Sequence, residues 1–178
     1  YNDGVPASLK RWRIPPKDIE VAQTIFTSSK PGLENVMFLR YKLLNKNYMD
    51  YDSVYFGFWA DPDLGNANDD RVGCDTLLNS GIVYNDGPDE FEYGDNPPAF
   101  FTTMLQGPMI ESGSNSDTAY NKLGELLGIR IFTNSQNSGI SAHSMYLGGD
   151  PTLSDPDNAE SARNYLMGKT RLGDFLDP

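Results

Sequence analysis

The sequence of 178 residues contains one cysteine and one histidine. A single cysteine excludes a disulfide within the chain, and a single histidine excludes a metal centre built from several imidazoles. No apolar run approaches the roughly 20 residues of a membrane-spanning helix, so we expect no membrane insertion. Basic residues are also few, at 14 against 25 acidic residues. The resulting net charge of −11 argues against binding to nucleic acid, whose affinity for proteins comes mainly from Lys and Arg.

Sequence motifs of catalysis are missing as well. The chain has no Gly-x-Ser-x-Gly elbow, no phosphate-binding loop, no dinucleotide fingerprint and no Cys-x-x-Cys pair. We expect His143 to be a structural, hydrogen-bonded residue within a strand and Cys74 to be a small buried side chain. A pair of carboxylates of the glycosidase type is an alternative, but the acidic residues cluster in polar loops, which do not raise a carboxyl pKa. The sequence therefore favours a protein that is not an enzyme, with a hydrolase as the remaining alternative.

The composition and the spacing of apolar residues predict a β-rich fold. The 17 Gly and 12 Pro residues indicate many turns, and 38% hydrophobic residues with 12% aromatics indicate a folded protein. Strands are predicted at residues 19–27, 36–45, 54–60, 81–85, 99–106, 129–134 and 141–147. Short strands closed by turn residues at this spacing are typical of a β-sandwich. We expect one all-β domain over residues 1–178, Ig-like or jelly-roll-like with long loops, as an interior piece of a longer protein.

One C-terminal helix is expected in addition. Asp157 is predicted to be its N-cap, because Glu160 follows three residues later, and Gly168 is predicted to end it. Residues 118–127 are a weaker candidate for a second short helix, since Gly124 and Gly128 oppose helix formation.

The stretch from Asp61 to Asp75 is the most distinctive part of the chain. It holds five Asp and two Asn within fifteen residues, and their crowded carboxylates repel one another unless a cation or solvent screens them. Ca²⁺ takes six to eight oxygen ligands from carboxylates, amides, backbone carbonyls and water. The sequence therefore predicts a calcium site, with an Asx-rich turn at a strand end as the alternative. The predicted ligands are Asp61, Asp63, Asn66, Asn68, Asp69, Asp70 and Asp75.

Two further groups of residues are candidates for binding. An acidic set follows residue 85 and either completes the first metal site, forms another or is a solvated loop; its members are Asp86, Asp89, Glu90, Glu92 and Asp95. Aromatic side chains in predicted loops, chiefly Trp12 and Tyr93, are candidates for stacking against sugars, although aromatic residues of an all-β domain mostly fill the core.

Several motifs resemble, in order, a module of large exported bacterial surface proteins that carry the sorting domain of the type nine secretion route. The resemblance begins at residues 38–45 and continues through Asp52-Ser53-Val54-Tyr55, Trp59-Ala60-Asp61-Pro62-Asp63-Leu64-Gly65, Asp69-Asp70-Arg71-Val72-Gly73-Cys74-Asp75-Thr76 and Gly81-Ile82-Val83-Tyr84-Asn85. It resumes at Pro97-Pro98-Ala99, Leu105-Gln106-Gly107-Pro108, Gly149-Asp150-Pro151-Thr152 and Asn164-Tyr165-Leu166-Met167-Gly168, and is absent between residues 109 and 141 apart from Leu123 and Gly128.

The resemblance implies an extracellular or cell-surface location and no established activity. Together with the acidic loop, it leads us to expect a calcium-stabilised structural or adhesive module of a secreted or cell-surface protein. Its partners would be other domains of the same exported protein. Two alternatives remain: a carbohydrate-binding module, and a self-associating subunit of an extracellular filament or layer.

Overall fold

The computed structural model describes residues 17–87, 91–124 and 126–176. The chain divides into two compact units, Tyr1–Val54 and Tyr55–Pro178, and each is described by itself. The prediction of one domain over the whole chain stays a prediction.

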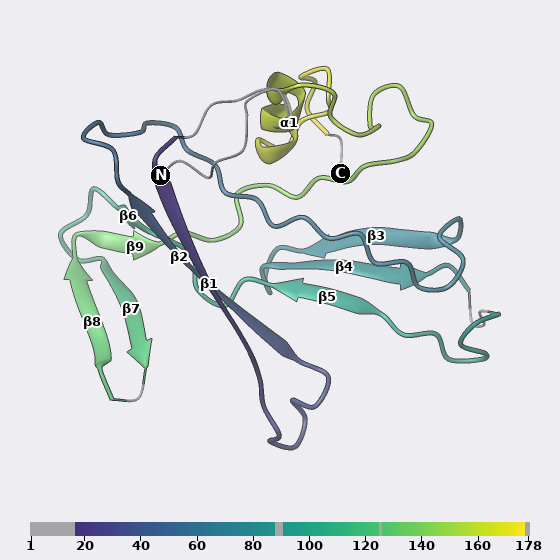
Figure 1. Ribbon diagram of the computed structural model, residues 1–178, viewed down its shortest axis with the longest axis horizontal. Coiled ribbons are helices and arrows are strands. Elements are labelled where there is room, and N and C mark those ends of the chain that lie inside the picture. The colour runs from purple at the N-terminus through teal and green to yellow at the C-terminus, as the bar shows by residue number, and fades with distance from the viewer. Residues whose placement is uncertain (1–16, 88–90, 125, 177–178) are drawn as a thin grey trace. The chain divides into compact units, whose positions relative to one another are not determined.

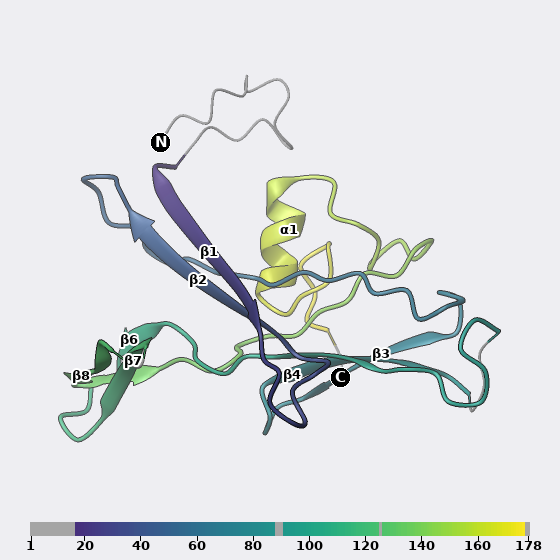
Figure 2. The ribbon, with the colours of Figure 1, turned by 60° about the horizontal axis from the view of Figure 1, so that its bottom comes forward.

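In the first unit, the described residues form a β-hairpin (Figures 1 and 2). β1 (Ile19–Thr27) pairs antiparallel with β2 (Met37–Asn45), in a register that runs from Ile19 opposite Asn45 to Thr27 opposite Met37. β-branched residues favour the extended backbone of β1, and Gly32 in the connection has a φ of 86°, which glycine adopts without strain. The prediction of both strands is confirmed, with β2 beginning one residue later than expected.

The described residues of the second unit form three small sheets and one helix (Figure 1). Its elements are β3 (Asp70–Asp75), β4 (Ser80–Asn85), β5 (Phe100–Thr103), β6 (Met109–Glu111), β7 (Thr118–Gly124), β8 (Gly128–Thr133), β9 (Ser135–Asn137) and α1 (Ala159–Leu166). The sheets have the strand orders β3-β4-β5, β6-β9 and β7-β8, and their paired strands are antiparallel. The prediction of a mostly β fold is thus confirmed, whereas a closed sandwich is not, because the sheets are small and open.

The core of the described residues is also small. Its buried hydrophobic side chains are Leu64, Ala119 and Tyr165, all in the second unit. The Tyr165 hydroxyl donates to the carbonyl of Ser154 at 2.8 Å, and its ring lies 4.6 Å from that of Tyr146. Burial raises the pKa of Tyr165, so this phenol stays a hydrogen-bond donor at neutral pH.

Two of the predicted strands are wrong. Residues 54–60 and 141–147 have no ladder of hydrogen bonds. The first follows Ser53, whose φ of 54° turns the backbone, and Phe56 and Trp59 in it are exposed. The second runs beside α1, where the Ser144 hydroxyl donates to the carbonyl of Tyr165 at 2.9 Å. Apolar composition favours an extended chain, but a strand needs a neighbour with a free edge.

Other expectations need smaller corrections. Residues 118–127 contain β7 rather than a helix, because Gly124 and Gly128 face each other at the end of the β7–β8 hairpin and Gly128 has a φ of 68°. β3, β6 and β9 were not predicted. Cys74 is exposed instead of buried, since β3 is an edge strand.

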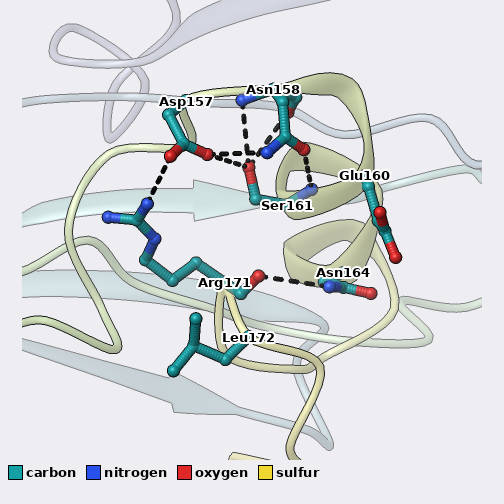
Figure 3. A pocket seen from close by; sticks show the side chains of 7 residues that line it. All are labelled: Asp157, Asn158, Glu160, Ser161, Asn164, Arg171 and Leu172. Carbon is teal, nitrogen blue, oxygen red and sulfur yellow. Dashed lines mark hydrogen bonds and ion pairs between the residues drawn. The ribbon is translucent and has the colours of Figure 1, made fainter.

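The helix starts one residue later than predicted. Asn158, not Asp157, is the N-cap, and it forms a capping box with Ser161: its Oδ1 accepts from the Ser161 N–H at 2.9 Å, and its own N–H donates to Ser161 Oγ at 3.2 Å. Asp157 instead accepts from Arg171 at 2.6 Å (Figure 3). Gly168, with a φ of 73°, supports the predicted C-terminal stop.

The capping box predicts a measurable loss of stability on Asn158→Ala. The variant removes the Oδ1 that accepts from the Ser161 N–H, while the backbone N–H of residue 158 can still donate to Ser161 Oγ. We expect the free energy of unfolding to fall by about 1 kcal/mol. Urea denaturation followed by circular dichroism measures this loss. Asn96→Ala, which removes an exposed asparagine far from α1 in sequence, serves as the control. Equal unfolding midpoints for the two variants would contradict the assigned cap.

Candidate functional site

The acidic loop folds back onto the first residue of β3. The Leu64 N–H donates to Asp70 Oδ2 at 3.0 Å, and Leu64 itself is buried with 6% of its surface exposed. Between them, Gly65 has a φ of 97°, which permits the reversal of the chain. The loop is therefore held by one apolar anchor and one charge-assisted hydrogen bond.

Asn66 organises the tip of the loop. Its Oδ1 accepts from the Asn68 backbone N–H at 3.3 Å and from the Asn68 side chain at 2.8 Å, while its carbonyl accepts from the Asp69 N–H at 3.2 Å. This is an Asx-type turn, the arrangement that Asn and Asp favour because their short side chains mimic the backbone. It points the chain from the tip directly into β3.

Two carboxylate oxygens at the start of β3 are buried without a hydrogen-bond partner among the described residues. They are Asp69 Oδ1 and Asp70 Oδ1. A buried polar atom left without a partner costs about 1–3 kcal/mol, and more when it carries charge. The adjacent end of β4 closes this corner, where Asn85 pairs with Asp70 and the Asp86 N–H donates to the Asp69 carbonyl at 2.8 Å.

One cation of the protein lies at the same corner. The Arg71 guanidinium donates to Asp86 Oδ2 through Nε at 2.9 Å and through Nη2 at 2.5 Å. The hydrogen bond with Asp86, followed by its charge, raises the pKa of Arg71, which stays protonated at all ordinary pH values. Arg71 thus neutralises Asp86, whereas the unpartnered oxygens of Asp69 and Asp70 receive no hydrogen bond from it.

The structure brings together some of the predicted ligands and separates others. Asp70 and Asp69 are adjacent and half-buried, and the Leu64 hydrogen bond holds the backbone after Asp63 against Asp70. Asp61 and the Asp63 side chain are exposed. Asp75 lies at the opposite end of β3, five residues or about 16 Å from Asp70.

Asp75 has a different structural task. Its Oδ1 accepts from the N–H groups of Leu77 and Leu78, each at 2.9 Å, and so closes the β3–β4 turn. Asp75 is close to Asp70 in sequence, but the two residues are the opposite ends of the extended strand β3 and are therefore far apart in space.

A preformed metal cage is not seen in the described part of the chain: no three histidine, cysteine, aspartate or glutamate side chains gather there at a distance suited to a metal ion. Amide oxygens, backbone carbonyls and water would have to complete any calcium shell around Asp69 and Asp70. Of the second acidic set, Asp86 reaches this corner, and Asp89 and Glu90 lie outside the described residues.

His143 packs against the same sheet but makes no hydrogen bond among the described residues, contrary to expectation. A Cβ built on Gly81 of β4 would lie 3.0 Å from His143 Nε2 and 3.0 Å from Thr102 Oγ1, so the imidazole occupies the space that a side chain at Gly81 would fill. Desolvation lowers the pKa of His143, which is therefore neutral at pH 7.

Two of the shallow cavities among the described residues of the second unit are lined by polar groups, many of which already form hydrogen bonds within the protein. The cavity of about 290 Å³ shown in Figure 3 lies at the start of α1 and contains the Asp157–Arg171 ion pair. Another, of about 310 Å³, is lined in part by Tyr120 and Asn137. The Asn137 amide is fully engaged with the backbone of Tyr120 and of Gly107.

Comparison with known proteins finds no match: no family model, no curated protein and no solved structure is similar to this chain. The resemblance to exported bacterial surface proteins therefore stays a prediction. Among the described residues, no helix has the length and apolar character needed to cross a bilayer.

The burial of His143 predicts a stability loss in acid. Its pKa is lower in the folded protein than the unfolded value of about 6.5, so protons bind the unfolded chain more readily. Stability from this residue is complete above pH 6.5 and declines as the pH falls below that value. Thermal unfolding from pH 7.5 to 5.0 should show a steeper decline for the wild type than for His143→Gln. Parallel profiles would contradict the burial of a neutral imidazole.

Proposed function

We propose that the chain is a non-enzymatic, calcium-stabilised structural or adhesive module of an exported bacterial surface protein, in which its sheets belong to a β-sandwich. The observation that carries the calcium proposal is the pair of buried oxygens, Asp69 Oδ1 and Asp70 Oδ1, that accept no hydrogen bond within the described residues. A divalent cation would satisfy both and would remove the repulsion between the two adjacent carboxylates.

The ligand set follows from the position of the loop. Asp69 and Asp70 supply the central carboxylates, and Asp63 is a further acid of the loop that directly precedes Leu64, whose N–H donates to Asp70. Asn66, Asn68 and Asp61 are placed on the loop outside this pair, where amide oxygens and water can complete a shell of six to eight oxygens. Asp75 is left out of the proposed set.

Calcium in this position would fasten the loop to the β3–β4 corner. At a free calcium concentration about 100 times the dissociation constant, binding adds about 2.7 kcal/mol to the free energy of unfolding. This is a large share of the 5–15 kcal/mol that is typical of folded proteins. Because few hydrophobic residues are buried among those described, this gain would be a larger share of the total stability than in a protein with a large core.

The non-enzymatic part of the proposal rests on the scarcity of catalytic groups. The single histidine, His143, is half-buried against Gly81, and the single cysteine, Cys74, stands on an edge strand. The exported location and the partnership with other domains of the same protein rest on the family resemblance alone.

Thermal unfolding with and without calcium tests the metal site. For the wild type we expect the unfolding temperature to rise by about 5–10 °C from excess chelator to millimolar calcium. Asp70→Asn keeps an oxygen that can accept from Leu64, but it loses a charge. The variant should therefore lose most of the calcium-dependent rise and be at least as stable as the wild type in chelator.

Asp75→Asn is the matched control for that experiment. It also exchanges one carboxylate of β3 for an amide, yet it lies at the far end of the strand. Its calcium-dependent rise should equal that of the wild type. An unchanged wild-type unfolding temperature in calcium, or equal losses in the two variants, would contradict the proposed site.

A carbohydrate-binding module is the second candidate, favoured by exposed aromatic rings in the turn after β4. Phe91 is 95% exposed and Tyr93 is 50% exposed, which leaves ring faces open for stacking on sugars. Trp12, the other predicted sugar-binding residue, lies outside the described residues.

A glycan array tests this alternative. Binding by the wild type should be lost in Tyr93→Ala and retained in Tyr84→Ala, which removes an exposed tyrosine from β4 instead. Failure of the wild type to bind any glycan, or equal binding by both variants, would contradict sugar binding by this turn.

A further inference from the structure

One face of the β1–β2 hairpin carries no charged side chain. In the antiparallel register, directly opposed residues share a face, so the odd-numbered residues of both strands lie together. We call this set the hairpin face; it consists of Ile19, Val21, Gln23, Ile25, Thr27, Met37, Leu39, Tyr41, Leu43 and Asn45. The opposite face holds the charged residues Glu20, Arg40 and Lys42.

Within its own unit, the hairpin face is apolar and uncovered. Its six large exposed side chains are Val21, Ile25, Met37, Leu39, Tyr41 and Leu43. None of residues 17–54 is buried, so the described part of this unit has no core of its own. An isolated two-stranded hairpin is marginally stable in water, and three strands or a covering layer are usually needed. This face therefore requires a covering surface.

The distribution of charge allows a second copy of the chain to be that surface. Residues 55–178 contain 19 of the 25 acidic and 6 of the 14 basic residues, a net charge of −13, whereas residues 1–54 carry +2. Two copies would therefore repel each other mainly through residues 55–178. The hairpin face lies in the other unit and is uncharged, so two copies can meet there with little electrostatic cost.

The order of residues along the hairpin face is suited to pairing with itself. The central cross-strand row is polar: Gln23 Nε2 donates to Tyr41 Oη at 2.6 Å. The rows on either side, Val21 with Leu43 and Ile25 with Leu39, are both apolar. A two-fold axis that lies between two such faces, crosses the central row and runs parallel or perpendicular to the strands brings the polar row onto the polar row and the apolar rows onto apolar rows. A closed pair of copies uses this kind of self-complementary surface.

We propose that the hairpin face binds the hairpin face of a second copy, forming a two-layer stack of hairpins about 10 Å apart. In this stack the Tyr41 hydroxyl can donate to Gln23 Oε1 of the second copy. The footprint, roughly 27 Å by 10 Å, is well below the 800 Å² per partner of a standard interface, so the association is weak and depends on concentration. This inference does not depend on calcium binding.

Sedimentation equilibrium of the full chain tests the proposal. The wild type should change from monomer to dimer between about 10 µM and about 500 µM. Ile25→Lys places a charge in the face and should remain monomeric over the whole range. Thr24→Lys adds the same charge to the opposite face of the same strand and should associate like the wild type.

Two results would overturn the proposal. One is a wild type that stays monomeric, and the other is association that Ile25→Lys leaves unchanged. If the wild type is monomeric and its unfolding temperature falls much more with Ile25→Lys than with Thr24→Lys, the chain covers this face itself.

Cross-linking gives a second readout that does not depend on a lysine substitution, which would itself destabilise the hairpin if this face were buried. In a Cys74→Ser background, Gln23→Cys puts a thiol in the central row, where either orientation of the two-fold axis brings it close to the second copy. A short dimaleimide should then produce covalent dimers at high protein concentration. Thr24→Cys on the opposite face should give far fewer. Equal yields from the two positions would overturn the proposed face.

Discussion

Leu64, Ala119 and Tyr165 are the buried hydrophobic side chains of the described residues. Burial of apolar side chains normally supplies most of the favourable free energy of folding, so the described residues obtain little of it. With so few buried apolar side chains, the structure relies on short-range polar contacts, and it leaves apolar surface that needs further cover.

The short-range response relies on carboxylates and amides that accept backbone N–H groups. Asp75 closes the β3–β4 turn, and Asn158 caps α1. Asp150 Oδ1 accepts from the N–H groups of Thr152 and Leu153 and from the Thr152 hydroxyl, and the hydrogen bonds from Thr152 lower the pKa of Asp150. None of these three residues has a buried side-chain oxygen without a hydrogen bond among the described residues. Asp69 and Asp70 differ because each keeps one buried oxygen without a hydrogen bond, and that difference separates a candidate metal ligand from an ordinary turn acid.

Sequence patterns predicted the elements whose signals are local. β1 and β2 alternate and are rich in β-branched residues, and Gly168 marks the end of α1. β3 was missed because its residues, Asp70–Asp75, include glycine and two acids, which are rare in strands; it forms because β4 offers a complementary edge. The strand predicted at residues 54–60 was wrong for the opposite reason: an apolar composition favours an extended chain but does not show whether a partner strand exists. The candidate site was predicted as one continuous stretch. Because residues 70–75 form the extended strand β3, Asp75 lies at the other end of the strand from Asp70, and this is known only once the pairing of β3 with β4 is known.

Calcium at the β3–β4 corner and self-association at the hairpin face would address the shortage of core in different ways. A metal ion replaces apolar burial by ionic bonds within one unit, where the uncompensated oxygens of Asp69 and Asp70 are the weak point. A second copy supplies apolar burial from outside, to a unit that has no buried residue among those described. The separation of charge makes the two compatible: the acids that attract a cation lie in residues 55–178, and the uncharged face lies in residues 1–54. A chain with its acids spread evenly over both units would gain the metal site but would repel its own copies at every surface.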